Sequence, residues 1–119
     1  MRALFFLLDD NNNIVPTDDM YAVSELLQDE ERCSVGHTDI CGTTVSTVFL
    51  GINHQSTPGQ TPLLFETAVI SIGGIDIVER YHNWEAAETG HDKWVAQGKG
   101  EQLRVLGIKA DIVQNAGLN

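Results

Sequence analysis

The chain has 119 residues, of which 42% are hydrophobic. This length and composition suit one domain with one ordinary core, and the chain is too short for a second independent domain. A count of 17 Asp and Glu against 7 Lys and Arg gives a net charge of −10, which argues against direct nucleic-acid or membrane binding and favours a protein partner with a basic surface. The chain contains only two cysteines and no signal-peptide pattern, which predicts reduced thiols and a cytoplasmic location. Its apolar runs are far shorter than the roughly 20 residues of a membrane helix, which predicts that no segment spans a membrane.

The N-terminal third predicts a strand, a turn and a helix. Ala3–Leu8 is a continuous apolar run that predicts a strand buried on both faces, and the Asp and Asn residues after it signal a turn. Ile14–Pro16 predicts a short edge strand. From Asp18 to about Glu31, hydrophobic residues recur at helical spacing and predict one helix, whose C-terminal end is expected to fray because Glu30 and Glu31 oppose the macrodipole.

Four segments rich in Val, Ile, Thr and Phe predict an antiparallel meander. They are Arg32–Asp39, Thr43–Ile52, Pro62–Ile72 and Ile75–Tyr81. Ile40–Gly42 and Gly73–Gly74 supply the hairpin turns, and Asn53–Gln60 is a long loop of the kind on which binding residues concentrate. In the second strand Val45, Thr47 and Phe49 are expected to share one face.

The last third predicts a second helix and sets the fold class. Asn83 is a suitable N-cap for a helix whose apolar stripe includes Trp84 and His91 and which is expected to end at Gly98. Residues 101–119 are predicted to form a separate C-terminal element or tail, of which Gln102–Val113 fits either a helix or a strand. We therefore predict a single α+β domain over 1–119, with an antiparallel sheet of four to five strands and two helices packed on it.

A metal site is the first chemical possibility. Cys33, His37 and Cys41 follow one another at intervals of four residues, and His54 lies further on. Residues four apart on an extended strand are separated by about 13 Å, so Cys33 and His37 cannot reach one ion without a bend. We predict neither a metal nor a cofactor.

Acid–base chemistry is the second possibility. Glu66 and Glu79 are predicted to lie on neighbouring strands and to face each other, and paired carboxylates can share proton-transfer roles. His91 lies in the apolar stripe, where a glutamate of the sheet could accept its proton and raise its pKa. These residues would serve a small hydrolase, although exposed glutamates and a satisfied core histidine are the simpler interpretation.

A nucleotide pocket is the third possibility. Arg80, Tyr81 and Trp84 could combine with the loop that carries His54, because aromatic stacking beside an arginine is suited to anionic bases. The full set of candidate ligand-binding residues is His54, Glu66, Glu79, Arg80, Tyr81, Trp84 and His91. A cyclic nucleotide held at the interface of a homo-oligomer would fit this interpretation. A cation–π contact between strand and helix is the structural alternative.

A group of acidic side chains near the N-terminus is the candidate partner-binding surface. These residues, which we call the acidic pole, are Asp18, Asp19, Glu25, Asp29, Glu30 and Glu31. Such residues commonly do no more than solvate a helix. A surface of this charge is also suited to binding a basic protein surface.

Several segments resemble a family of small uncharacterised phage and prophage proteins. These segments are Val45–His54, Pro62–Thr67, Glu79–Tyr81, Trp84–Ala86 and Gly90-His91. The resemblance covers about the middle half of the chain and implies a phage-like origin and a place in the host cytoplasm. Our leading hypothesis is a non-enzymatic inhibitor of a host defence factor that binds through the acidic pole. A sponge for a nucleotide signal is the alternative, and a small hydrolase is the third.

Overall fold

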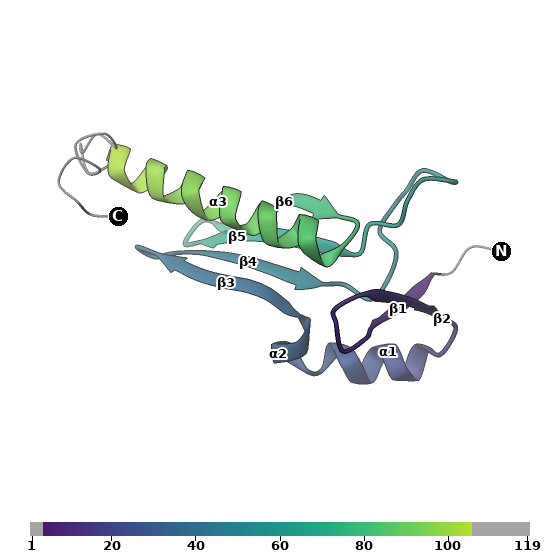
Figure 1. The fold of residues 1–119 in the computed structure, drawn as a ribbon. Coiled ribbons are helices and arrows are strands. Elements are labelled where there is room, and N and C mark those ends of the chain that lie inside the picture. The colour runs from purple at the N-terminus through teal and green to yellow at the C-terminus, as the bar shows by residue number, and fades with distance from the viewer. Residues whose placement is uncertain (1–3, 106–119) are drawn as a thin grey trace.

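The computed structural model describes residues 4–105, with side chains up to Gly100. The elements are β1 (Phe5–Leu8), β2 (Ile14–Thr17), α1 (Met20–Leu27), α2 (Glu30–Cys33), β3 (Ser34–Ile40), β4 (Thr43–Phe49), β5 (Phe65–Ser71), β6 (Gly74–Tyr81) and α3 (Trp84–Val105). In Figure 1, α3 lies along one face of the main sheet, and the N-terminal elements gather at one end of it. The predicted α+β class is confirmed.

The main sheet is an antiparallel meander with the strand order β3-β4-β5-β6. β3 and β4 are joined at the predicted turn by Cys41 and Gly42, whose φ angles of 47° and 89° are both positive. Two positive φ angles are characteristic of the tight hairpin turn that matches the twist of antiparallel strands, and Gly42 adopts one without strain. The predicted meander is therefore confirmed, with strands that are shorter than expected at several ends.

The two faces of the sheet have different environments. Val45, Thr47 and Phe49 share one face, as predicted, and all three are buried beneath α3. We call the opposite face of the sheet the open face, because in the described part of the chain no helix lies across most of it (Figure 1). The cross-strand pairing places Ser46 and Val48 on this face.

The N-terminal elements form a lobe of their own. β1 and β2 make a separate two-stranded sheet, and β1 is tied to the segment after β4 by two bonds: Phe6 N to Gly51 O at 2.8 Å and Asn53 N to Leu4 O at 3.0 Å. The prediction that the first strand is buried on both faces is wrong. Only Phe6 and Leu8 are buried, because the pleat alternates the side chains and the other face is partly open to solvent.

The predicted helix over Asp18–Glu31 is in fact two helices. Asp19 caps α1 by accepting from the N–H groups of Tyr21 and Ala22, and Asp29 caps α2 by accepting from Arg32 N at 3.2 Å. The expected fraying at Glu30 and Glu31 is also wrong. Both lie in the first turn of α2, where the macrodipole favours negative charge.

The last helix is longer than predicted. Asn83 caps α3 by accepting from Ala86 N at 2.8 Å, which confirms its predicted role. The predicted end at Gly98 is wrong, because α3 continues to Val105 and Gly98 packs closely against Ile40 of β3. Residues 106–119, which make up most of the predicted C-terminal element, lie outside the described residues.

The hydrophobic core lies where the lobe, the sheet and α3 meet. The ring centroids of Phe49 and Phe65 are 5.2 Å apart, and the Trp84 ring meets Phe65 edge-on at 6.1 Å. Such tilted and edge-on pairs are the favourable arrangements for aromatic rings. No helix within residues 4–105 combines the length and the apolar character needed to cross a membrane.

Candidate functional site

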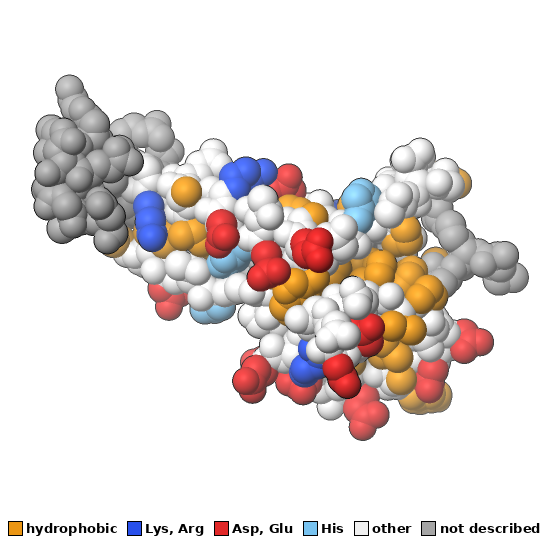
Figure 2. Space-filling model, in the orientation of Figure 1, with side chains coloured by type: hydrophobic (Ala, Val, Ile, Leu, Met, Phe, Trp, Pro, Cys, Tyr) orange, Lys and Arg blue, Asp and Glu red, His pale blue; other side chains and the backbone are white. Residues whose placement is uncertain are grey.

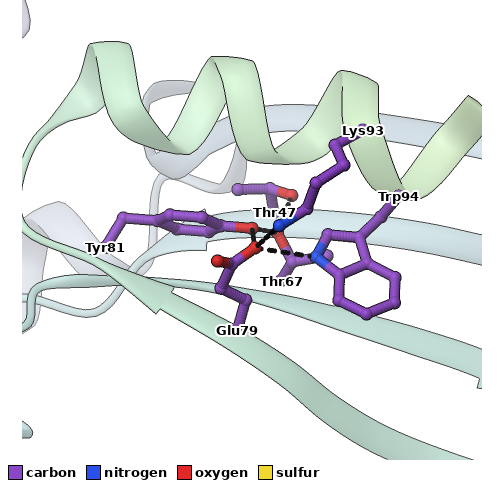
Figure 3. A network of polar contacts seen from close by, with 6 residues as sticks. All are labelled: Thr47, Thr67, Glu79, Tyr81, Lys93 and Trp94. Carbon is purple, nitrogen blue, oxygen red and sulfur yellow. Dashed lines mark hydrogen bonds and ion pairs between the residues drawn. The ribbon is translucent and has the colours of Figure 1, made fainter.

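A continuous chain of hydrogen bonds connects the sheet to α3 (Figure 3). We call it the polar network, and its members are Thr38, Thr47, Thr67, Glu79, Tyr81, His91, Lys93 and Trp94. Within it the hydroxyl groups of Thr47 and Thr67 are 2.6 Å apart, and that of Thr67 is 2.9 Å from the Tyr81 hydroxyl. Thr47 and Thr67 are completely buried, so these bonds are shielded from water.

His91 closes one end of the network, and Glu79 closes the other. The Nε2 atom of His91 is 2.9 Å from Thr38 Oγ1, and its Nδ1 atom is 2.8 Å from Thr47 Oγ1. The Oε1 atom of Glu79 accepts from the Tyr81 hydroxyl at 3.2 Å. The same oxygen accepts from Lys93 Nζ at 2.6 Å and from Trp94 Nε1 at 2.9 Å.

The carboxylate at one end determines the direction of the bonds from Glu79 to His91. A carboxylate only accepts, so Tyr81 donates to Glu79. Thr67 must then donate to Tyr81, and Thr47 to Thr67. Since the Thr47 proton is used, His91 donates to Thr47 through Nδ1–H. Burial lowers the pKa of His91 and so favours the neutral ring, in which Nε2 accepts from the Thr38 hydroxyl.

Two glycines make room for the network. A Cβ atom on Gly36 of β3 would lie 2.6 to 2.8 Å from the ring atoms of His91. A Cβ atom on Gly90 of α3 would lie 2.2 Å from the Tyr81 hydroxyl oxygen. The close approach of α3 to the sheet therefore depends on the absence of side chains at these two positions.

The pKa values agree with a structural role. Burial lowers the pKa of His91, with the charge of Asp92 acting in the opposite direction and that of His37 lowering it further. The hydrogen bond from Lys93 is the largest influence on Glu79 and helps to hold the pKa of its carboxyl below the ordinary value. The prediction that a glutamate raises the pKa of His91 is wrong, because threonine hydroxyls occupy both ring nitrogens.

The neutral state of His91 makes stability depend on pH. In the unfolded chain His91 takes up a proton near its ordinary pKa of 6.5, whereas the folded protein resists protonation until lower pH. We expect the free energy of unfolding to be at its full value above 6.5 and to fall as the pH decreases through the lowered pKa of the folded state. Urea midpoints measured at about pH 7.5 and about pH 5.5 test this.

The comparison variant for this measurement is His91→Gln, which cannot titrate and should show a flatter pH dependence over the same range. Glu79 does not contribute to the difference between these two pH values, because its contribution to the free energy of unfolding is lost only as the pH falls below its ordinary pKa of 4.5. Equal midpoints for the native protein at the two pH values would contradict the assignment.

The structure separates Glu66 from Glu79. Glu66 lies opposite Arg80 on the open face, with its Oε1 atom 3.3 Å from Arg80 Nε, whereas Glu79 lies opposite Thr67 on the helix face. The prediction that the two glutamates face each other is therefore wrong. A β-bulge between Thr67 and Ala68 changes the register of β5 and β6, and adjacent rows of a sheet point in opposite directions.

The residues of the predicted nucleotide pocket do not come together. Arg80 and Tyr81 point to opposite faces of β6, and Tyr81 is buried in the polar network. Trp84 packs on Phe65. A shallow cavity of about 470 Å³ lies beside Tyr81, lined partly by Glu79 and Lys93, but neither Arg80 nor His54 contributes to it.

The two cysteines lie at opposite ends of β3. Cys33 is buried and its Sγ atom lies 3.3 Å from Leu26 O, whereas Cys41 is exposed at the tip of the β3–β4 hairpin. Within the described residues there is no group of three or more His, Cys, Asp or Glu side chains placed to hold a metal ion.

The acidic pole is exposed at all six positions, and none of its carboxylates makes an ion pair with a described side chain. Arg32, the nearest cation in sequence, is turned inward. Its guanidinium donates to Asn12 Oδ1 at 2.9 Å and to the carbonyl oxygens of Leu8 and Asp9 at 3.3 and 2.9 Å. Arg32 therefore stabilises the β1–β2 turn and leaves the pole largely unneutralised. Figure 2 shows acidic side chains around this lobe.

Apolar side chains lie among these acidic residues. Met20 and Tyr21 at the start of α1 are 57% and 84% exposed. Next to α2 there is a cavity of about 670 Å³, with Leu27 and Val48 in its lining and Glu30 and Glu31 also contributing. Exposed aromatic and apolar residues within a charged surface are a common composition of protein-binding sites.

Sequence reasoning found His91, Glu79 and Tyr81 but missed the threonines that join them. The available signal was the pattern of β4, where Thr47 occupies the same face as Val45 and Phe49. Comparisons of the chain with protein-family models, with curated proteins and with solved structures give no match.

Proposed function

We propose that the protein is a non-enzymatic binding protein whose acidic pole docks on a basic surface of a partner protein. The observation that carries the proposal is the combination of six exposed carboxylates, which form no ion pair with the side chains that the structure describes, with an inward-facing Arg32. A surface of unpaired like charges is costly for the protein on its own and becomes favourable when a partner supplies the opposite charge.

The shape beside the pole supports a partner that is both basic and apolar. The cavity next to α2 offers an apolar lining from Leu27 and Val48 to the stem of a lysine or arginine, and Glu30 and Glu31 lie close enough to meet the charged head. Tyr21 supplies a rigid aromatic contact of the kind that dominates binding energy at interfaces.

The polar network supports binding over catalysis. Thr47 and Thr67 are completely buried and their hydroxyl groups are used within the network, so neither can reach a substrate. The resemblance to phage proteins supports a partner in the host cell, and an inhibitor of a host defence factor is the form of this function that we propose.

Neutralising part of the pole tests the proposal. The variant E25Q/E30Q/E31Q removes three negative charges, while the capping residues Asp19 and Asp29 stay in place. The probe is an arginine-rich peptide containing one tryptophan, titrated at low and at physiological ionic strength. We expect the native protein to bind more weakly as salt rises, and the variant to bind about tenfold more weakly than the native protein at low salt.

The matched control is E85Q/E88Q/D92N, which removes the same charge from the exposed side of α3. It should bind the peptide nearly as well as the native protein. Equal losses in the two variants would show that only net charge matters, and a native affinity independent of salt would contradict an electrostatic mechanism.

A further inference from the structure

The end of the sheet that lies away from the lobe carries an exposed apolar surface. Ile72 in the β5–β6 turn is fully exposed at 107%, and Ile75 and Ile77 of β6 are 67% and 47% exposed. Cross-strand pairing places Ile75 beside Ile70 and Ile77 beside Ala68 on the open face. We call these five residues the isoleucine patch.

Charge distinguishes this patch from most of the rest of the molecule. On β5 and β6 the open-face rows of the patch contain no charged side chain, and the next row contains the ion pair of Glu66 with Arg80. The patch rows continue across β4 to His37 and Asp39 of β3, two strands away from the edge. A basic partner would therefore find no excess negative charge on the β5–β6 side of this face. The acidic pole lies on α1 and α2, at the other end of the sheet (Figure 1).

The patch is complementary to itself. A two-fold axis that crosses the strands at the patch places isoleucine against isoleucine, and it carries the Glu66–Arg80 ion pairs of the two copies to opposite sides of the contact. The same axis keeps the acidic poles at the outer ends of the assembly, where the repulsion between them is screened. A second copy of this chain therefore fits the patch without burying like charges.

The edge of the sheet borders the patch. Within the described residues β6 pairs only with β5, so it is an edge strand, and its first half, from Gly74 to Ile77, contains no proline but does contain the exposed Asp76. Charged residues commonly block pairing at exposed edges, so the contact between copies is one of faces, with this edge at its border. The backbone groups of this segment that point away from β5 can supply the polar part of an interface.

We propose that a second copy of this chain docks on the isoleucine patch and forms a two-fold dimer with one acidic pole at each end. The dimer presents two binding surfaces, so a partner with two basic sites is held more tightly than a monomer could hold it. The dimer itself rests on the open face and does not depend on the function proposed for the pole, whereas its two-site binding of a partner does.

Sedimentation of the full chain tests the proposal over protein concentrations from about 1 to about 500 µM. We expect the native protein to associate reversibly to a dimer in this range. Ile77→Lys should raise the dissociation constant of the dimer by about a hundredfold, because it places a like charge at the two-fold contact. Ile77→Thr, a neutral change on an exposed strand, should raise it by a smaller factor.

The matched control is Val15→Lys, since Val15 is 40% exposed on β2 of the lobe and lies outside the patch. It should dimerise like the native protein, and thermal unfolding of all variants shows that each is folded. A native protein that stays monomeric throughout the range would overturn the proposal, and would leave residues 106–119 or a foreign protein as the occupant of the patch. Equal effects of Ile77→Lys and Val15→Lys would overturn it as well.

Discussion

Replacing Gly90 by alanine is expected to lower the free energy of unfolding by about 3 kcal/mol, although alanine normally favours a helix over glycine by about 1 kcal/mol. The added Cβ atom would lie 2.2 Å from the Tyr81 hydroxyl oxygen and 2.3 Å from two ring carbons. Tyr81 is 6% exposed and is held by Thr67 and Glu79, so its ring cannot move away without breaking the polar network. Urea unfolding followed by circular dichroism measures the change.

Gly100→Ala is the matched control for this prediction. Gly100 lies in the same helix, and a Cβ atom there would meet no other atom within 4 Å. The control should raise stability by about 0.5 to 1 kcal/mol, through helix propensity alone. If both alanine variants are more stable than the native protein, α3 does not approach Tyr81 as closely as described.

Replacing Thr47 by valine is expected to lower the free energy of unfolding by about 2 kcal/mol with little change in shape. The substitution removes the acceptor of the His91 Nδ1–H group, which is 2.8 Å from Thr47 Oγ1. His91 is only 7% exposed, so water has little access to the orphaned donor.

Thr44→Val is the control for Thr47→Val, since it makes the same chemical change in the same strand but on the open face. The Thr44 hydroxyl donates to Asp39 Oδ1 at 2.6 Å in an exposed position. Its loss should change stability by no more than about 0.5 kcal/mol. Equal effects of the two valine variants would contradict the assignment of the buried network.

Sequence patterns predicted the parts of the fold that depend on local chemistry. The alternation of Val45, Thr47 and Phe49 and the turn at Cys41-Gly42 are local signals, and the structure confirms both. The break between α1 and α2 was missed because no apolar residue lies between Leu27 and Cys33 that could show a change of periodicity. The helices separate at Asp29, whose carboxylate caps α2 by accepting from Arg32 N. Aspartate also occurs on helix surfaces, so its presence in the sequence does not by itself indicate a cap.

The polar network was predicted less well than the fold, because strand register and helix packing determine which side chains become hydrogen-bond partners. His91 was found from its apolar neighbours, but the pairing of Glu79 with Thr67 depends on a β-bulge that no local signal predicts. Threonine suits both faces of a strand, so the burial of Thr67 follows only from the position of α3. Likewise Gly98 resembles a helix C-cap but lies where α3 crosses Ile40.

The order of the strands has a consequence for the speed of folding. In β3 to β6 every strand pairs with its neighbour in sequence, so the meander can form with little loop entropy to overcome. The contacts that complete the molecule span much longer distances along the chain: 53 residues between Thr38 and His91, and 44 between Thr47 and His91. We expect the meander to be structured in the transition state for folding, and α3 to dock after it, so that substitutions in α3 accelerate unfolding more than they slow folding.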